Sequence, residues 1–469
     1  MREKAQQNAQ HSTERRTIMR QLPIRLIFAL ILVLGVRAAA AAPCGGLLQP
    51  SCPPPPQCRD GVDNDRDAVI DLADSGCSST QDNNEWDDVA PDVGGMATID
   101  IDPRTTSKLF GFNTSLSSWN WSPPAPHSGI TVEQEAALIR NVGGNAQRLG
   151  IQWYAVEPAR GQRNEPALAW VDAMEAELRT NEMRAILIVW EAPTWANDYG
   201  SCPVTDLQCI YKSRNQQLQR FAPPKDINAY ASFLAWVAQR YPEAAIETWN
   251  EPNIKGFWNA NPWPDAARMA RMQCAAYDAI KAANPTTTVL APGLSLVITQ
   301  SATSYPYLDF MHSLYQQMGR VCWDALSVHI YADISIDGPD SVAAKAFRII
   351  RNLRAQYGDT TPIWITETGV TTSGSEDHPS FPRRTPEQQR DINRAAVNEY
   401  LSTPDVGAVI IHTLRDRPIW IFDNPDNVEY GFGLLYDGEG PTPSPKPAYC
   451  HFIWVVGAIY PGCQPWAAQ

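Results

Sequence analysis

From about residue 97 onward, short apolar runs alternate with stretches whose apolar residues recur at helical spacing. Most of the runs have the length of a strand and are followed by a helical stretch. Eight such units over roughly 360 residues predict an α/β fold of the (β/α)8 TIM-barrel type, in which chemistry takes place at the C-terminal ends of the strands. The candidate strands are Leu109–Asn113, Ala146–Trp153, Arg184–Trp190, Ala245–Asn250, Thr288–Pro292, Ala325–Tyr331, Ile363–Glu367 and Gly407–His412.

Helical spacing marks seven intervening stretches, and Asp265 and Thr385 suit helix N-caps. A doubly wound open sheet is the alternative fold. That fold would more naturally show a Gly-rich phosphate-binding turn after the first strand, and the sequence has none there. The predicted helical stretches are Val132–Val142, Ala167–Leu178, Ile227–Arg240, Asp265–Ala282, Val342–Tyr357, Pro386–Leu401 and Ala448–Ile459.

The fourth candidate strand ends in the sequence Ile-Glu-Thr-Trp-Asn-Glu-Pro-Asn at 246–253. Pro252 cannot continue a central strand, so Asn250 and Glu251 are expected to lie where the strand opens into a cleft. Glycosidases generally use two carboxylates, and Glu367 ends the seventh candidate strand. The two glutamates are therefore the predicted catalytic pair. Glu157 and Glu191 are rival carboxylates; we expect Glu157 to brace a loop and Glu191 to be able to line the cleft.

Composition and charge narrow the class of protein. The chain has 469 residues, of which 44% are apolar and 19% charged, as expected of a soluble globular protein. Its net charge is −13, and it lacks the basic surface that nucleic-acid binding requires. It also contains 16 Trp, a side chain suited to stacking on sugar rings, although most are expected to be core residues. Trp195, after the third strand, and Trp420, after the eighth, are candidate substrate contacts.

The N-terminus has the features of an export signal. Basic residues, among them Arg20 and Arg25, precede an apolar run at 26–36 that is short for a membrane span, and an Ala-rich tract follows at 38–42. We expect cleavage near Ala42 and a secreted, cell-surface or periplasmic protein. The expected division is a signal peptide at 1–42, a Pro-rich linker with an Asp-rich segment at 43–96, and a catalytic domain at 97–469.

All ten cysteines lie beyond the expected cleavage point, and an even number in an exported chain indicates disulfides. Pairing between neighbours is the simplest hypothesis, although the sequence alone does not establish connectivity. The neighbouring pairs are Cys44–Cys52, Cys58–Cys77, Cys202–Cys209, Cys274–Cys322 and Cys450–Cys463.

The Asp-rich segment between Cys58 and Cys77 has the spacing of a calcium-binding loop. Ala68 stands where such a loop turns on Gly, and the last candidate ligand is a short Asp rather than a bidentate Glu. A structural calcium site and an acidic solvated linker therefore remain alternatives. The candidate ligands are Asp63, Asp65, Asp67, Asp71 and Asp74.

Three motifs occur in order at the ends of the expected strands four, six and seven: Trp249–Asn253, His329–Tyr331 and Thr366–Gly369. With them, residues 97–460 resemble clan A glycoside hydrolases, and families 5 and 39 are the most similar. This resemblance implies a retaining O-glycosyl hydrolase with Glu251 as acid/base and Glu367 as nucleophile. It implies Asn250 at the sugar 2-hydroxyl, Arg148 and Tyr331 beside the nucleophile, and His329 near the acid/base.

Two departures from the family pattern concern the sugar site. Trp190 and Glu191 follow strand three, where many family 5 enzymes have a His, and His412 occupies strand eight, where an aromatic platform is usual. The predicted function is hydrolysis of a β-linked polysaccharide by a monomer that needs no catalytic cofactor and no membrane beyond the export signal. The alternatives are a catalytically inactive carbohydrate-binding barrel at the cell surface and a calcium-dependent adhesion protein.

Overall fold

The protein is described by a computed structural model, whose described residues all belong to one of the chain's two units, 90–469. No helix among them is long and apolar enough to cross a membrane. The expected export signal, the Asp-rich segment and the boundary near residue 97 lie outside the described residues. These residues are 100–113, 130–197, 221–259, 263–297, 300–331, 342–376, 378, 380–417, 426–437 and 442–463.

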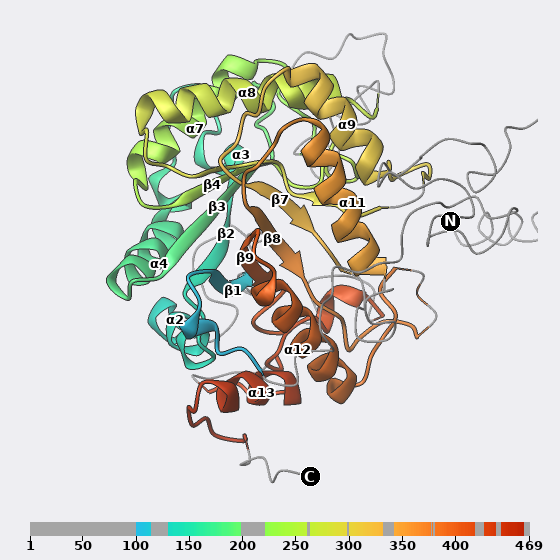
Figure 1. Ribbon diagram of the computed structural model, residues 1–469. Coiled ribbons are helices and arrows are strands. Elements are labelled where there is room, and N and C mark those ends of the chain that lie inside the picture. The colour runs from blue at the N-terminus through green and yellow to red at the C-terminus, as the bar shows by residue number, and fades with distance from the viewer. Residues whose placement is uncertain are drawn as a thin grey trace, which may run out of the picture. The chain divides into compact units, whose positions relative to one another are not determined.

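A curled parallel sheet forms the centre of the fold (Figure 1). Its order is β5-β4-β3-β2-β1-β9-β8-β7-β6, and every strand pair is parallel. The strands are β1 (Leu109–Asn113), β2 (Ala146–Gln152), β3 (Arg184–Trp190), β4 (Ala245–Thr248), β5 (Val289–Leu290), β6 (Leu294–Ser295), β7 (Leu326–His329), β8 (Ile363–Thr368) and β9 (Val406–Ile411).

The two ends of this sheet belong to one short stretch of chain. β5 pairs with β4, and β6, which begins four residues after β5 ends, pairs with β7. Leu290 of β5 also makes a parallel bridge to Ala325, directly before β7. The sheet thus curls back on itself, as in a TIM-like barrel. Of the predicted fifth strand, Thr288–Pro292, only Val289–Leu290 is a strand, because Pro292, which lacks an N–H, and Gly293 interrupt the chain there; β6 lies beyond the predicted boundary.

Helices cover the outside of the curled sheet (Figure 1). All seven predicted helical stretches are present, with ends shifted by a few residues, and the prediction did not name α9 or the short α3. The helices are η4 (Pro103–Thr105), α2 (Val132–Asn141), α3 (Trp153–Val156), η5 (Glu165–Ala167), α4 (Ala169–Thr180), α7 (Ile227–Arg240), α8 (Ala266–Ala283), α9 (Tyr307–Met318), α11 (Val342–Gln356), α12 (Pro386–Ser402), η8 (Val428–Tyr430) and α13 (Pro447–Val455).

Two helix starts predicted from the sequence are N-caps in the structure. The Asp265 side chain accepts a hydrogen bond from the Arg268 backbone at the start of α8. Thr385 and Gln388 form a reciprocal capping box at the start of α12. Such caps satisfy backbone N–H groups that have no partner within the helix.

A small apolar cluster fills the interior of the sheet, separate from the larger core beneath the helices. It includes Ala146, Ala245 and Ala408 near the starts of β2, β4 and β9, together with Leu290, Ala325 and Trp364. Side chains contributed by strands all around the sheet therefore pack together near its N-terminal end. Polar groups gather instead at the C-terminal ends.

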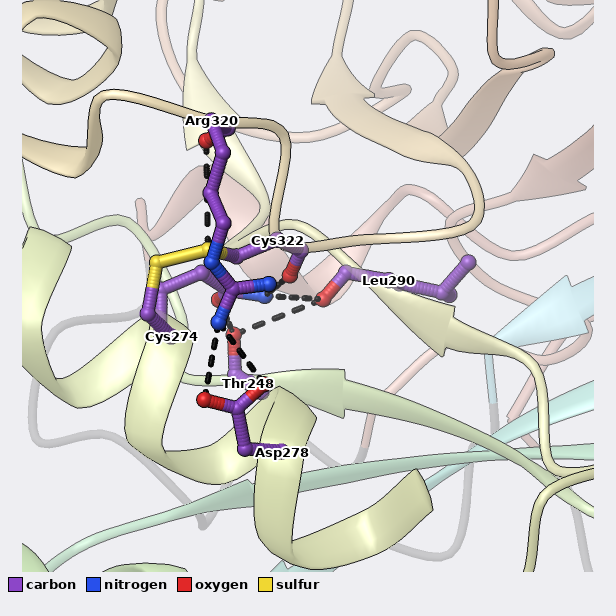
Figure 2. Close-up of a disulfide and its surroundings, with 7 residues drawn as sticks. Thr248, Cys274, Asp278, Leu290, Arg320 and Cys322 are labelled. Atoms are coloured by element: carbon purple, nitrogen blue, oxygen red, sulfur yellow. Dashed lines mark hydrogen bonds and ion pairs between the residues drawn. A yellow bond between two sulfur atoms is a disulfide. The ribbon is translucent and has the colours of Figure 1, made fainter.

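Two predicted disulfides lie within the described residues and are confirmed. Cys274 of α8 bonds to Cys322, ahead of β7, and Cys450 of α13 bonds to Cys463. Beside the first disulfide, an ion pair joins Arg320 to Asp278, which also lies on α8 (Figure 2). These contacts attach α8 to the chain entering β7. The other three predicted disulfides lie outside the described residues.

Candidate active site

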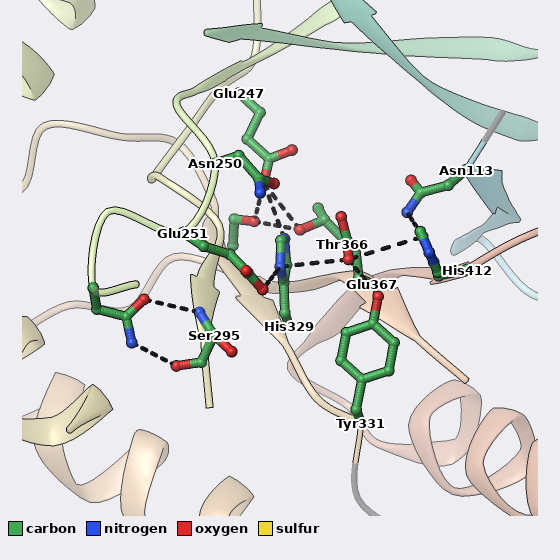
Figure 3. Close-up of polar contacts among 12 residues, drawn as sticks. Asn113, Glu247, Asn250, Glu251, Ser295, His329, Tyr331, Thr366, Glu367 and His412 are labelled. Carbon is green, nitrogen blue, oxygen red and sulfur yellow. Dashed lines mark hydrogen bonds and ion pairs between the residues drawn. The ribbon is translucent and has the colours of Figure 1, made fainter. Parts of the chain in front are cut away.

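Polar side chains converge at the C-terminal ends of the parallel strands (Figure 3). Because these ends meet at one edge of the sheet, residues far apart in sequence become neighbours. The contributing residues are Asn113 (end of β1), Arg148 (β2), Glu247 (β4), Asn250 and Glu251 (after β4), His329 (end of β7), Tyr331 (two residues later), Glu367 (β8) and His412 (after β9).

Glu367 is surrounded by groups that favour its ionised form. Arg148 Nη1 lies 2.6 Å from Oε1, and the Tyr331 hydroxyl donates a hydrogen bond to Oε2. Burial alone would raise the pKa of Glu367, but His329 and Arg148 outweigh it and hold the pKa well below its usual range. Glu367 is therefore a carboxylate held ionised inside the protein, as a nucleophile must be.

Glu251 follows β4 in a constrained backbone conformation. Its φ is +41°, and its N–H donates to the Gly293 carbonyl oxygen at 2.7 Å. The side chain turns toward His329, whose Nδ1 lies 2.9 Å from Oε1. One carboxylate oxygen from each glutamate and one His329 nitrogen all lie within 4.8 Å of one another. The two glutamates of the predicted pair are thus brought together. The Arg148 guanidinium beside Glu367 already balances the negative charge that could otherwise attract a metal cation to this cluster.

Arg148 connects both sides of this site. Besides Glu367, its guanidinium contacts Glu247 through Nε at 2.5 Å and the Asn250 side-chain oxygen through Nη2 at 3.1 Å. Burial would lower the pKa of Arg148, but Glu247 and Glu367 raise it above its ordinary value. This residue therefore stays charged and holds Glu367 at a fixed distance from β4.

Sequence reasoning missed Glu247, a third carboxylate beneath the pair. It is 0% exposed and accepts hydrogen bonds from Ser327 at 2.5 Å and Thr366 at 3.0 Å as well as from Arg148. In the sequence, Glu247 could have been recognised as a single charged residue at the end of an apolar run, four residues before Glu251. A buried charge of this kind requires partners, which points to an internal network.

His329 lies between the two catalytic candidates. Its Nδ1 faces Glu251 and lies 3.6 Å from Glu367 Oε2, while Nε2 lies 3.5 Å from Arg148 Nη2. Burial would lower the pKa of His329, yet the two carboxylates raise it. The Nδ1–H group of His329 donates toward Glu251 Oε1, so His329 positions that carboxyl group.

A second polar chain, also absent from the sequence prediction, extends from Glu367 toward the loop after β9. His412 Nδ1 lies 3.0 Å from the Asn113 amide nitrogen and 3.9 Å from Glu367 Oε2. On the other side of the ring, Nε2 lies 3.2 Å from Glu429, which also pairs with Arg417 at 3.1 Å. His412, which directly follows β9, therefore makes polar contacts through both of its ring nitrogens.

The other predicted residues lie elsewhere. Trp195 packs edge-to-face on Trp153, and its indole N–H donates to the Glu157 carbonyl oxygen at 2.9 Å. The Glu157 side chain braces its own loop, as expected, by accepting from Trp153 and from the Gly161 backbone. Glu191 is buried after β3. Trp420 and the five Asp residues proposed for calcium lie outside the described residues.

Comparison with known proteins identifies a family. The model of the family described as cellulase (glycosyl hydrolase family 5) matches residues 100–401. No curated protein matches the chain.

Solved structures share the fold at low identity. A family 39 glycoside hydrolase from Bacteroides cellulosilyticus WH2 has a TM-score of 0.52 at 19% identity, with 76% of this chain and 64% of that chain covered. A hyperthermophilic β-glucosidase from Pyrococcus furiosus has a TM-score of 0.53 at 15% identity, with 75% and 96% covered. A GH5_18 protein from Bifidobacterium longum subsp. infantis has a TM-score of 0.50 at 17% identity, with 75% and 78% covered.

Proposed function

The chain is a glycosidase that belongs to glycosyl hydrolase family 5, and we propose that it is an exported enzyme that cleaves a β-linked polysaccharide with retention of anomeric configuration. Glu367 is the nucleophile and Glu251 the acid/base. An inactive carbohydrate-binding barrel is the alternative; it is disfavoured because both carboxylates are present and face the same site.

The observation that carries this proposal is the close approach of the two glutamates. An oxygen of Glu251 and an oxygen of Glu367 lie within 4.8 Å of each other. Retaining enzymes hold their carboxyl groups ~5–5.5 Å apart, whereas inverting enzymes leave ~6.5–9.5 Å for a water molecule. The spacing therefore favours direct attack by a carboxylate.

In the first step a Glu367 oxygen forms a bond to the anomeric carbon as the bond to the leaving oxygen breaks. Glu251 transfers its proton to that oxygen, which leaves as an alcohol. In the second step Glu251, now ionised, takes a proton from water while the water oxygen displaces Glu367. Two displacements at one carbon restore its configuration.

The charges around the pair suit these roles. Arg148 and the Tyr331 hydroxyl stabilise the ionised nucleophile, and both contact Glu367 directly. The Asn250 side-chain oxygen accepts a hydrogen bond from Arg148, which leaves the Asn250 NH2 to donate to a hydroxyl of the sugar in this proposal.

Several further proposals concern the whole protein. Residues 1–42 would direct export, and the two disulfides support an oxidising compartment. The Asp-rich segment would bind a structural calcium ion and the catalytic domain would begin near residue 97. Family 5 chemistry needs no cofactor, and we propose a monomer.

The test is a screen of the purified protein on glucans, mannans, xylans and bacterial exopolysaccharides, followed by NMR of the first-formed product. We expect a β product from a β-linked substrate. Glu367→Gln should abolish hydrolysis, whereas Glu243→Gln, an exposed glutamate ahead of β4, should leave it intact and serves as the matched control. An α product, or full activity in Glu367→Gln, would overturn the assignment.

Azide tests the role of Glu251 separately. Glu251→Ala should retain the first step only for substrates with good leaving groups, because these need little protonation. Added azide should then restore turnover and yield a β-glycosyl azide. If azide has no effect, or yields an α-glycosyl azide, Glu251 is not the acid/base.

A further inference from the structure

We infer that Glu429, oriented by His412 and Arg417, binds a hydroxyl group of the sugar that Glu367 attacks. This inference rests on the proposed function and makes Glu429 a specificity-determining residue. Only the imidazole ring of His412 separates Glu429 from the nucleophile: one ring nitrogen faces Glu429 at 3.2 Å and the other lies 3.9 Å from Glu367.

The direction of the hydrogen bonds follows from Arg148. Arg148 Nη1 lies 3.4 Å from the Asn113 side-chain oxygen, so the amide NH2 of Asn113 faces His412 Nδ1 at 3.0 Å. Nδ1 therefore accepts, and the ring hydrogen is on Nε2, which donates to Glu429 Oε2. The orientation of Glu429 is thus set by a chain of contacts that begins at the arginine holding the nucleophile.

One of the two carboxylate oxygens of Glu429 is available to a ligand. The contacts of Glu429 with His412 and Arg417 both involve Oε2, and Oε1 has no hydrogen-bond partner among the described residues. The side chain is 33% exposed, and the backbone is held by the Asn427 side chain, which accepts from the Glu429 N–H at 2.9 Å. Burial would raise the pKa of Glu429, but Arg417 and His412 lower it to about 2. An ionised, solvent-accessible acceptor therefore lies beside the reaction centre.

His412 itself is poorly placed to serve as the sugar platform. Its side chain is 9% exposed. The ring packs edge-to-face against Phe432, with centroids 5.3 Å apart, and against Tyr331 at 6.0 Å. The His412 ring is largely covered and both of its nitrogens have partners. We therefore expect the more exposed Glu429, rather than His412, to contact the sugar.

The hydrogen-bonding chemistry of the pair identifies the ligand group. Glu429 and Arg417 form an ion pair at 3.1 Å, so each side chain already has a partner of opposite charge. A carboxylate accepts a hydrogen bond and a guanidinium donates one, and a hydroxyl group can satisfy either. The expected ligand is therefore an uncharged sugar hydroxyl. The ring position is left to the experiment.

The experiment measures kcat/KM of wild type and Glu429→Ala on the preferred aryl β-glycoside and on its 2-, 3-, 4- and 6-deoxy analogues, where those carbons bear hydroxyls. Loss of a hydrogen bond to a charged group predicts a ~10- to 100-fold fall for the parent glycoside. For the one analogue that lacks the recognised hydroxyl, the same substitution should cost less than ~3-fold, because the bond is already absent. Glu387→Gln, an exposed glutamate on α12, is the control and should match wild type.

A purely structural role for Glu429 would give a different pattern. Glu429→Ala would then lower kcat/KM by the same factor for every analogue, and that result would overturn the inference. Substitution without any effect on the parent glycoside would overturn it as well.

The inference and the proposed function can fail separately. If wild type hydrolyses no glycoside, the proposed function fails. The subsite is then tested by calorimetry, which measures the binding of free sugars and their deoxy forms to two variants, Glu367→Ala and Glu367→Ala/Glu429→Ala. Weaker binding of one intact sugar to the double variant, with no further loss for one of its deoxy forms, would support the subsite. Equal binding to both variants, or no binding at all, would refute it.

Discussion

Replacing Glu247 by glutamine removes a negative charge from a fully buried position while preserving the shape of the side chain. In the native protein this carboxylate lies 2.5 Å from Arg148 Nε and accepts hydrogen bonds from the Ser327 and Thr366 hydroxyls. Without it, the Arg148 guanidinium keeps only one anionic partner, Glu367. The perturbation therefore tests whether the network beneath the catalytic pair depends on this charge.

The expected loss follows from the geometry. Removing one partner of a buried ion pair costs about 3–5 kcal/mol, because the remaining charge is left uncompensated. The glutamine oxygen can still accept from Arg148, and its NH2 can donate to the two hydroxyl oxygens, so we expect about 3 kcal/mol, the lower end of that range. That is a large share of the 5–15 kcal/mol that typically holds a domain folded, as an order of magnitude.

Urea unfolding followed by tryptophan fluorescence measures the loss. Glu247→Gln should lower the unfolding midpoint without changing the slope, because the surface exposed on unfolding is the same. Glu243→Gln makes the same charge change at an exposed site and should stay within about 0.5 kcal/mol of wild type. If the two variants were equally stable, the proposed dependence of the Arg148 network on Glu247 would be refuted.

Three other predictions concern space, acid and calcium. Gly293→Ala should lower kcat by about 100-fold, because the new Cβ would overlap the His329 imidazole and the Glu247 carboxylate. Gly256→Ala places its Cβ in open space and should match wild type in the same assay. Glu367 and Glu429 have folded pKa values below the ordinary value of a glutamate, so the stability that they contribute is present above that ordinary value and is lost as the pH falls through the folded values. Each Glu→Gln variant should flatten the acid limb of a plot of unfolding free energy against pH. Chelation should lower the thermal stability of the Asp-rich segment at 58–77 while leaving turnover nearly intact, and absence of calcium binding by calorimetry at millimolar concentration would rule out that site.

The order of strands and helices could be predicted from the sequence because each element buries one side. Its apolar residues therefore recur in the sequence at the spacing of a strand or of a helix. The proximity of Glu251 and Glu367 could be predicted because parallel strands bring their C-terminal ends to one edge of the sheet. The division of the fifth strand depends on Pro292 and Gly293, whose backbone effect the apolar pattern does not express.

The surroundings of the pair were less predictable. Asn113, at the end of the first strand, and Glu429, in a late loop, meet at His412, and Arg417 pairs with Glu429; no local motif links these residues. Trp195 illustrates the opposite case: its residue type suits sugar stacking, but its ring packs on Trp153. Side-chain chemistry alone does not indicate whether a residue at a strand end turns inward.

The most direct test of the central claim is mass spectrometry of the protein after reaction with activated 2-deoxy-2-fluoro β-glycosides of several sugars. These reagents slow the second step, so the glycosyl-enzyme accumulates. We expect one added glycosyl unit, on the peptide and at the position of Glu367. A label on Glu251 or Glu247 in an active enzyme, or full activity with an inverted product and no label, would contradict the account.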